Sequence, residues 1–240
     1  LADAVILRMV AVHAESAVVV GGGLIGCEAA SSLATRGMLT TLVAPEPVPL
    51  LRRFGSEVGE RVAKMLFDSG VRFIGSATVT AVEDTGVLMD TGEAIEGELV
   101  VSAVGVCPDI RLATTAGLDT ENGRIVVDER MHTSALNVYA AGDVALAYNV
   151  TAGRRIPAEH WRDAAQQGRI AGQSAAGYPA AWDAVPEFSC TIGESVLKYR
   201  GWGAGYEHSS LVEHRDGFTV RYQAGSEVIG VLSATTSPGA

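Results

Sequence analysis

Three glycines in one short segment, Gly21, Gly23 and Gly26, have the spacing of a loop that holds a diphosphate. They follow a continuous apolar, β-branched run and lead directly into a segment of helical character. Glycine permits a tight turn, backbone approach to a pyrophosphate and close helix-to-strand packing, while the helix N-terminus favours negative charge. The segment therefore predicts a dinucleotide site, with the loop amides, including those of Leu24 and Ile25, as its cradle. The alternative is a glycine-rich turn that only fits a helix against a sheet.

The residues after the second predicted strand bear on which dinucleotide would bind. An acidic side chain normally accepts hydrogen bonds from both ribose hydroxyls at this point, whereas a 2′-phosphate requires arginine. Here Ala44 occupies the acidic position, Glu46 comes slightly later, and Arg52 and Arg53 follow. Glu46 could reach the ribose, either arginine could meet a phosphate, or all three could be solvated loop charges. The preference between NADH and NADPH stays open.

Alternating strands and helices are predicted around the glycine loop. Apolar runs indicate buried strands at 17–20, 40–43 and 71–74. Helical patterns lie between them, at 24–36 and at 58–70. This order predicts a parallel sheet with right-handed crossovers, because a tight turn cannot join parallel neighbours. The expected fold class is α/β.

Shorter strands are expected further along the chain. Residues 77–98 predict a β-meander that closes the first unit, and a strand at 99–105 opens a second organisation. Short strands are predicted within this second part at 125–127 and 137–141.

A long helix is predicted from Pro157 to about residue 176. Its expected inner face consists of small residues, so that a sheet or a flat ligand could approach its backbone: Ala164, Gly168, Ala171, Gly172 and Ala175. A short amphipathic helix is expected at 1–10, and aromatic strands are expected around 196–199, 218–222 and 228–232.

The composition excludes several classes of function. The chain has 240 residues, a formal net charge of −10 and 48% hydrophobic residues. These values indicate a globular protein and disfavour nucleic acid and anionic membrane surfaces as partners. Cys27, Cys107 and Cys190 are widely separated and lack metal-ligand spacing. They therefore predict no metal site and favour a reducing, cytoplasmic environment.

Four motifs occur in a fixed order: residues 19–28, residues 105–109, residues 139–143, and Glu159-His160-Trp161 followed by Ala164, Gln167 and Gly168. Together they resemble the pyridine nucleotide-disulfide oxidoreductase family of flavoproteins, and within it the ferredoxin, rubredoxin and putidaredoxin reductase branch. The resemblance covers about residues 1 to 200. It implies a Rossmann-like NAD(P)-binding domain inserted in an FAD-binding domain, and it adds Gly105 to the cofactor-binding residues.

The same resemblance implies a division into four parts. These are a linker helix at 1–11, an NAD(P)H-binding domain at 12–97, the C-terminal half of the FAD-binding domain at 98–178, and a truncated C-terminal reductase domain of the dimerisation or interface type at 179–240. A first FAD fingerprint is expected before residue 1. The chain given is therefore expected to bind NAD(P)H weakly and to hold little or no FAD.

Further site residues are implied by the resemblance. Asp143 would hydrogen-bond a ribityl hydroxyl of FAD rather than serve as an ordinary turn aspartate. Glu28 would contact the nicotinamide end of NAD(P)H rather than only complement the helix dipole. Glu159 would face the nicotinamide and Trp161 would lie beside the flavin, although Trp161 could equally be a core tryptophan. His160 joins the cofactor-binding set as a structural side chain, because hydride transfer to a flavin requires no protein base.

The implied activity is that of an NAD(P)H:acceptor oxidoreductase. Hydride passes from NAD(P)H to FAD, and single electrons then pass to a small iron-sulfur or rubredoxin-type carrier; a homodimer is left open. The alternatives are an NADH oxidase, the flavin module of a nitrite reductase, and a non-enzymatic dinucleotide-sensing module similar to apoptosis-inducing factor. Two departures from the family pattern stand out. No cysteine matches the reactive pair of the disulfide-reducing branch, and Ser189 and Cys190 stand where an aromatic residue is expected.

Overall fold

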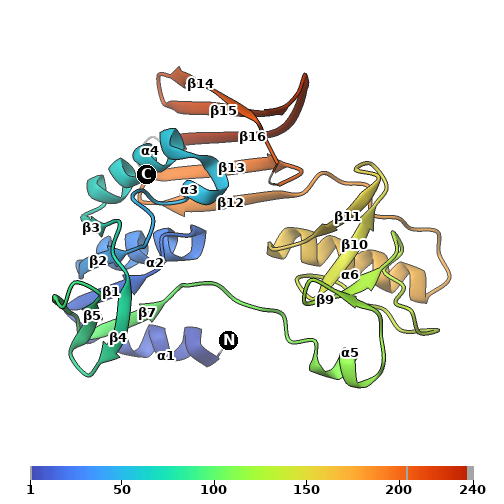
Figure 1. Ribbon diagram of the computed structural model, residues 1–240, viewed down its shortest axis with the longest axis horizontal. Helices are drawn as coiled ribbons and strands as arrows, with labels where there is room; N and C mark the ends of the chain where they lie inside the picture. Colours follow the sequence, from blue (N-terminus) through green and yellow to red (C-terminus); the bar gives the residue numbers. More distant parts are fainter. Residues whose placement is uncertain (1, 204, 237–240) are drawn as a thin grey trace. The chain divides into compact units, whose positions relative to one another are not determined.

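The computed structural model describes residues 2–203 and 205–236 of the chain (Figure 1). Within these residues the chain forms two compact units. The first contains residues 2–105, 190–197 and 234–236, and the second contains residues 106–189, 198–203 and 205–233. The expectations for residues 237–240 lie outside the described residues.

The first unit is built on a four-stranded sheet in which every recorded pairing is parallel. Its strands lie in the order β3 (Val71–Ile74), β2 (Leu39–Val43), β1 (Ser16–Val20) and β7 (Leu99–Ser102). The three strands predicted from apolar runs are therefore confirmed. The fourth corrects an expectation, because β7 pairs with β1 instead of opening the second part of the chain. The boundary expected between residues 97 and 98 falls before a strand of this sheet.

Two helices of the first unit follow the predicted patterns. Helix α2 (Leu24–Ala34) ends shortly before Gly37, and α4 (Ser56–Asp68) buries Val58, Val62 and Leu66 as their spacing predicts. A short helix that the sequence did not indicate, α3 (Leu51–Phe54), lies in the proline-rich connection. The initial helix is present as α1 (Ala2–Val10), and none of its residues is buried.

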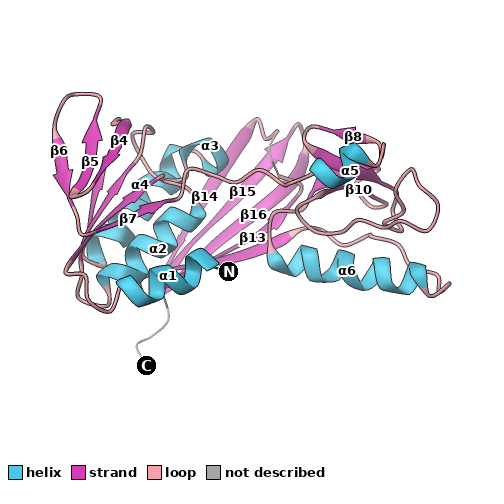
Figure 2. Cartoon of the chain, turned by 90° about the horizontal axis from the view of Figure 1, so that it is seen from below, coloured by secondary structure: helices cyan, strands magenta, loops and turns pink. Residues whose placement is uncertain are grey.

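The predicted meander is also confirmed. Strands β4 (Val79–Glu83), β5 (Gly86–Met89) and β6 (Ala94–Glu96) form an antiparallel sheet of their own (Figure 2). Val87, Met89 and Ile95 of this sheet pack with Val18 and Val43 of the parallel sheet. The meander therefore covers the parallel sheet where a helix would otherwise be needed.

The second unit contains a smaller sheet with the order β11 (Arg154–Pro157), β10 (Ala145–Asn149), β9 (Arg124–Val127) and β8 (Thr120–Glu121). A short helix, α5 (Arg111–Thr115), precedes it. The predicted strand at 125–127 is present as β9. The strand predicted at 137–141 is wrong, because Asn137 has a positive φ of 62° and only Tyr139 makes an isolated bridge, to His132.

The long helix of the second unit, α6, spans Trp161–Ala175. The prediction that Pro157 begins it is wrong, because Pro157 is the last residue of β11 and pairs with Leu146. The predicted inner face is wrong as well. Asp163, Gln167, Ile170 and Ser174 are the buried residues of α6, whereas an added Cβ at Gly168 or Gly172 would meet nothing within 4 Å.

The C-terminal strands form a five-stranded sheet. Its order is β12 (Glu187–Ile192), β13 (Ser195–Gly201), β16 (Glu227–Thr236), β15 (Gly217–Ala224) and β14 (His208–His214). The three aromatic strands expected here are confirmed as β13, β15 and β16, and the sequence missed β12 and β14. Buried Phe188 stacks on Tyr199, and Tyr199 meets Tyr222 edge to face along this sheet. Across the described helices, none is long and apolar enough to cross a membrane.

Candidate functional site

The first and third glycines of the loop are required by packing. Gly21 has a φ of +116°, and a Cβ at this residue would collide with the carbonyl oxygen of Ala103. A Cβ at Gly26 would collide with the carbonyl oxygen of Gly21. Helix α2 therefore lies against the end of β1 as closely as two backbones allow.

The second glycine differs from the other two. Gly23 is the N-cap residue of α2, with φ −79° and ψ −177°, which any residue could adopt. An added Cβ there would meet nothing within 4 Å, and no side chain caps the helix. The absence of a side chain at Gly23 thus leaves backbone open at a helix N-terminus, which fits the diphosphate of a dinucleotide. Leu24 and Ile25 begin the helix beside this opening, and the Ile25 side chain is 64% exposed.

A hollow of about 230 Å³ opens at the carboxyl ends of β1 and β7. These two strands flank the point where the strand order reverses, which is where ligands bind in open α/β sheets. Its lining is mostly apolar and consists of Val20, Val79, Thr80, Ala81, Val82, Ser102 and Val104. The sequence did not indicate this hollow, because its lining comes from three strands separated along the chain.

Two of the candidate ribose or phosphate contacts are paired with each other. Glu46 Oε1 lies 2.5 Å from Arg52 Nε, and the side chain of Glu46 is 19% exposed against 84% for Arg52. Glu46 is therefore held by an ion pair on the loop, while Arg52 remains largely exposed to solvent. Ala44, at the usual acidic position, is 1% exposed and belongs to the core. The guanidinium of Arg53 lies over the ring of Phe54.

Glu28 contacts a distant part of the chain within the same unit. Its Oε1 accepts a hydrogen bond of 3.0 Å from the backbone N–H of Thr191 in β12. The neighbouring thiols are buried beside it: Cys27 Sγ lies 3.7 Å from Gly22 O, and Cys190 Sγ lies 3.8 Å from Leu24 O. Burial raises the pKa of Cys27 to about 12, and burial, with Glu28 and Cys27 nearby, raises that of Cys190. These thiols are therefore protonated and unreactive at neutral pH.

In the second unit, the predicted Asp143 lies on a glycine turn that two side chains hold. Gly142 has a φ of +81°, and its N–H donates to Gln167 Oε1 at 2.9 Å. Arg124 Nε donates to the carbonyl oxygen of Asp143, and its Nη2 donates to Glu159 Oε1, both at 3.0 Å. Two predicted site residues, Asp143 and Glu159, are thus brought together by an arginine that the sequence did not indicate.

The side-chain amide of Gln167 bears on whether a flavin fits beside the Gly142–Asp143 turn. The residue is fully buried, and its Nε2 has no hydrogen-bond partner in the described residues. A buried donor without an acceptor is costly, so a group bound beside the Gly142 turn would find a donor already in place. Gln167 and the Asp143 turn therefore fit a bound polar cofactor.

Trp161 and His160 lie where α6 begins. The indole of Trp161 is 68% exposed and the guanidinium of Arg162 lies over it, so the core-tryptophan alternative is wrong. His160 caps α6 through its Nδ1, which accepts from the N–H of Arg162. Gly105 has a φ of +113°, and an added Cβ would meet nothing within 4 Å.

Asp163, in the first turn of α6, is the carboxyl with the most shifted pKa. Burial raises its pKa to about 6, a backbone hydrogen bond from Glu187 opposes the shift, and the charges of Glu187 and Asp143 add to it. An Arg162–Glu187 ion pair of 3.0 Å lies in the same group of charges. The fold therefore favours the neutral form of Asp163. No group of His, Cys, Asp or Glu in the described residues could hold a metal ion.

The chain is similar to known proteins in both sequence and fold. Residues 1–168 match the pyridine nucleotide-disulphide oxidoreductase family, and the chain belongs to that family. A rubredoxin-NAD(+) reductase of Pseudomonas putida is 32% identical over 215 residues, which cover 88% of this chain and 55% of the relative.

Two solved structures are similar over nearly the whole chain. The ferredoxin reductase for the CYP199A2 system of Rhodopseudomonas palustris has a TM-score of 0.88 at 27% identity, covering 97% of this chain and 59% of its own. The covalent putidaredoxin reductase–putidaredoxin complex has a TM-score of 0.89 at 28% identity. The match covers 98% of this chain and 58% of the chain in that structure. The chain thus spans little more than half the length of these proteins. The predicted family, its ferredoxin reductase-like branch, the α/β fold class and the oxidoreductase class are confirmed.

Replacing the packed and the open glycine should separate folding from binding. Gly26→Ala should lower the free energy of unfolding by about 3 kcal/mol, because its Cβ would displace the Gly21 carbonyl. Gly23→Ala should change it by less than about 1 kcal/mol, because its Cβ points into open space. Urea denaturation of the two variants measures both values. Equal losses would contradict the assignment of different roles to the two glycines.

The stability of the second unit should depend on the charge of Asp163. Because its pKa is raised from 3.8 to about 6, its contribution to stability is fully present below pH 3.8 and is lost as the pH rises through 6. Asp163→Asn should therefore raise the melting temperature by about 4 °C at pH 8 and by clearly less at pH 4.5. Thermal melts at both pH values test this, with the exposed Asp183→Asn as the control. The same shift at both pH values would contradict the pKa assignment.

Proposed function

We propose that the protein is an NAD(P)H-dependent flavoprotein reductase that delivers electrons to a small iron-sulfur or rubredoxin-type carrier. The observation that carries the proposal is the open backbone at Gly23, where an uncapped helix N-terminus follows a buried parallel strand. The names of the similar proteins, among them a rubredoxin-NAD(+) reductase and a putidaredoxin reductase, support the kind of acceptor.

The first unit would bind the pyridine nucleotide. The amides of Gly23, Leu24 and Ile25 would hold the diphosphate, helped by the positive end of the α2 dipole. The apolar hollow between β1 and β7 has room for a ring of the nucleotide. Glu46, fixed by Arg52, would accept hydrogen bonds from a ribose and would repel a 2′-phosphate. We therefore expect a preference for NADH.

The second unit would hold part of the flavin cofactor. The Asp143 carboxylate would accept a hydrogen bond from the ribityl chain, and Gln167 Nε2 would supply a further donor. The exposed indole of Trp161 would cover a ring face, and Glu159 would orient the nicotinamide amide. FAD, when bound, supplies a two-electron acceptor that releases electrons singly. His160 serves as the helix cap rather than as a base.

The acceptor is tested by steady-state assays, with NADH, of FAD-loaded protein that includes the FAD fingerprint expected before residue 1. Reduction of a ferredoxin or rubredoxin supports the proposal, whereas turnover with oxygen or nitrite alone would favour an oxidase or a nitrite reductase module. Failure to reduce any acceptor, including artificial ones, would favour a dinucleotide-sensing module. The assay also decides the reaction direction, because NADH consumption and carrier reduction are followed separately.

Blocking the cradle should abolish nucleotide binding without unfolding the chain. Gly23→Ala should raise the dissociation constant for NADH at least about tenfold, because the new methyl group occupies the position expected for the diphosphate. The control is Gly168→Ala, which also adds a methyl group in open space but in helix α6. Fluorescence titration with NADH measures both. An unchanged dissociation constant in the Gly23→Ala variant would refute the proposed cradle.

Nucleotide preference should depend on the carboxylate of Glu46. Glu46→Gln keeps the shape of the side chain and removes the charge that opposes a 2′-phosphate. The ratio of the dissociation constants for NADPH and NADH should fall about tenfold in this variant. Arg52→Met serves as the companion, since it leaves the Glu46 charge unpaired and should raise the ratio. An unchanged ratio in both variants would show that neither residue meets the ribose.

A further inference from the structure

We infer that Arg124 is a positioning residue that fixes Glu159 and the Asp143 turn relative to each other. The inference rests on the proposed function, in which Glu159 orients the nicotinamide and Asp143 meets the flavin. Arg124 itself is not assigned a contact with either cofactor. Its role is to keep two cofactor-facing groups of the second unit in one arrangement.

The contacts of Arg124 join three segments of the unit. Arg124 is the first residue of β9, and its side chain is 18% exposed. Its two hydrogen bonds run to the Asp143 carbonyl and to the Glu159 carboxylate, at 3.0 Å each. The backbone of β9 adds a third link, because the N–H of Ile125 donates to the carbonyl oxygen of Val144 at 2.8 Å. The backbone of β9 and the side chain of Arg124 therefore both bind the turn that carries Asp143.

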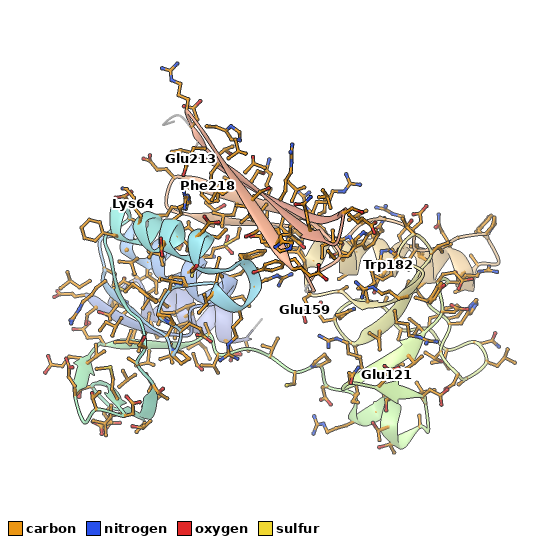
Figure 3. The ribbon with its side chains drawn as sticks, turned by 45° about the horizontal axis from the view of Figure 1, so that its top comes forward. Lys64, Glu121, Glu159, Trp182, Glu213 and Phe218 are labelled. Carbon is orange, nitrogen blue, oxygen red and sulfur yellow. The ribbon has the colours of Figure 1, made fainter. Side chains whose placement is uncertain are left out.

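Arg124 supplies the positive charge that pairs with Glu159, which is labelled in Figure 3. Asp143 and Glu187 are close enough to Asp163 to raise its pKa, so carboxylates gather at this end of α6. The Glu159 side chain is 52% exposed and pairs with Arg124, as Glu187 pairs with Arg162. Without the guanidinium, Glu159 would lose the ion pair with Arg124, the contact that ties it to the Asp143 turn.

Arginine suits this place better than lysine would. Its planar guanidinium presents Nε and Nη2 as donors in a fixed geometry, whereas an ammonium is a point charge on a flexible stem. The turn also keeps a separate anchor, the hydrogen bond from the Gly142 N–H to buried Gln167. Loss of Arg124 should therefore loosen the turn without unfolding the unit.

The first measurement is amide hydrogen exchange of the chain without cofactor. Arg124→Met should speed exchange about tenfold in peptides covering residues 142–146, and Arg124→Lys should lie between this variant and the wild type. The matched control is Arg162→Met, which removes a positive charge from the same group of charges without a recorded contact to Asp143 or Glu159. Exchange at the turn should not change in the control.

The second measurement uses FAD-loaded protein that includes the FAD fingerprint expected before residue 1. Arg124→Met should raise the dissociation constant for FAD and the KM for NADH about tenfold each, with a smaller change in kcat. Adding Glu159→Gln to Arg124→Met should raise the KM less than Glu159→Gln does alone, because the carboxylate is no longer tied by Arg124 to the Asp143 turn. Flavin fluorescence reports the first constant independently of turnover.

Three outcomes would overturn the inference. Faster exchange with unchanged FAD affinity and KM would show a structural role only. Equally fast exchange at residues 142–146 in Arg162→Met would show a general charge effect. A wild-type protein that binds neither FAD nor NADH would overturn the proposed function, and this inference with it. Failure of the proposed function is seen in the wild-type protein, which then binds neither cofactor. If only the inference about Arg124 is wrong, the wild-type protein still binds both cofactors.

Discussion

The contact on which the first unit depends is the approach of the α2 backbone to the end of β1. Gly26 lies so close to the carbonyl oxygen of Gly21 that no side chain fits between them. This packing sets the direction of α2, and the direction of α2 determines where its N-terminal amides point. Gly23 is therefore open because of a constraint at Gly26, not because of anything Gly23 itself contacts.

In the second unit the main constraint is electrostatic, because several carboxylates lie in the same region. Four carboxylates, those of Asp143, Glu159, Asp163 and Glu187, belong to one region. Arg124 and Arg162 each form an ion pair with one of these carboxylates. The raised pKa of Asp163 favours the neutral form of a third. The polar chemistry of this unit thus depends on charge balance, whereas that of the first unit depends on backbone packing.

The features that were predicted correctly from the sequence are those that depend on neighbouring residues. The glycine spacing, the buried strands and the pattern of α4 each depend on a few neighbouring residues. The partners of Arg124 lie 19 and 35 residues away, and no periodicity reveals such a pair. Strand β7 was assigned to the wrong sheet because an apolar strand carries no information about its neighbour. The strand expected at 137–141 failed because the positive φ of Asn137 turns the chain.

The contact between Glu28 and Thr191 has a consequence for the order in which the chain is made. Residues 190–197 belong to the first unit, where the N–H of Thr191 donates to Glu28 and a side chain at Gly193 would collide with the Ser69 hydroxyl. A ribosome synthesises α2 and α4 long before this hairpin emerges. The first unit is therefore complete only after residues 106–189 of the second unit have been synthesised, so neither unit corresponds to one uninterrupted stretch of translation.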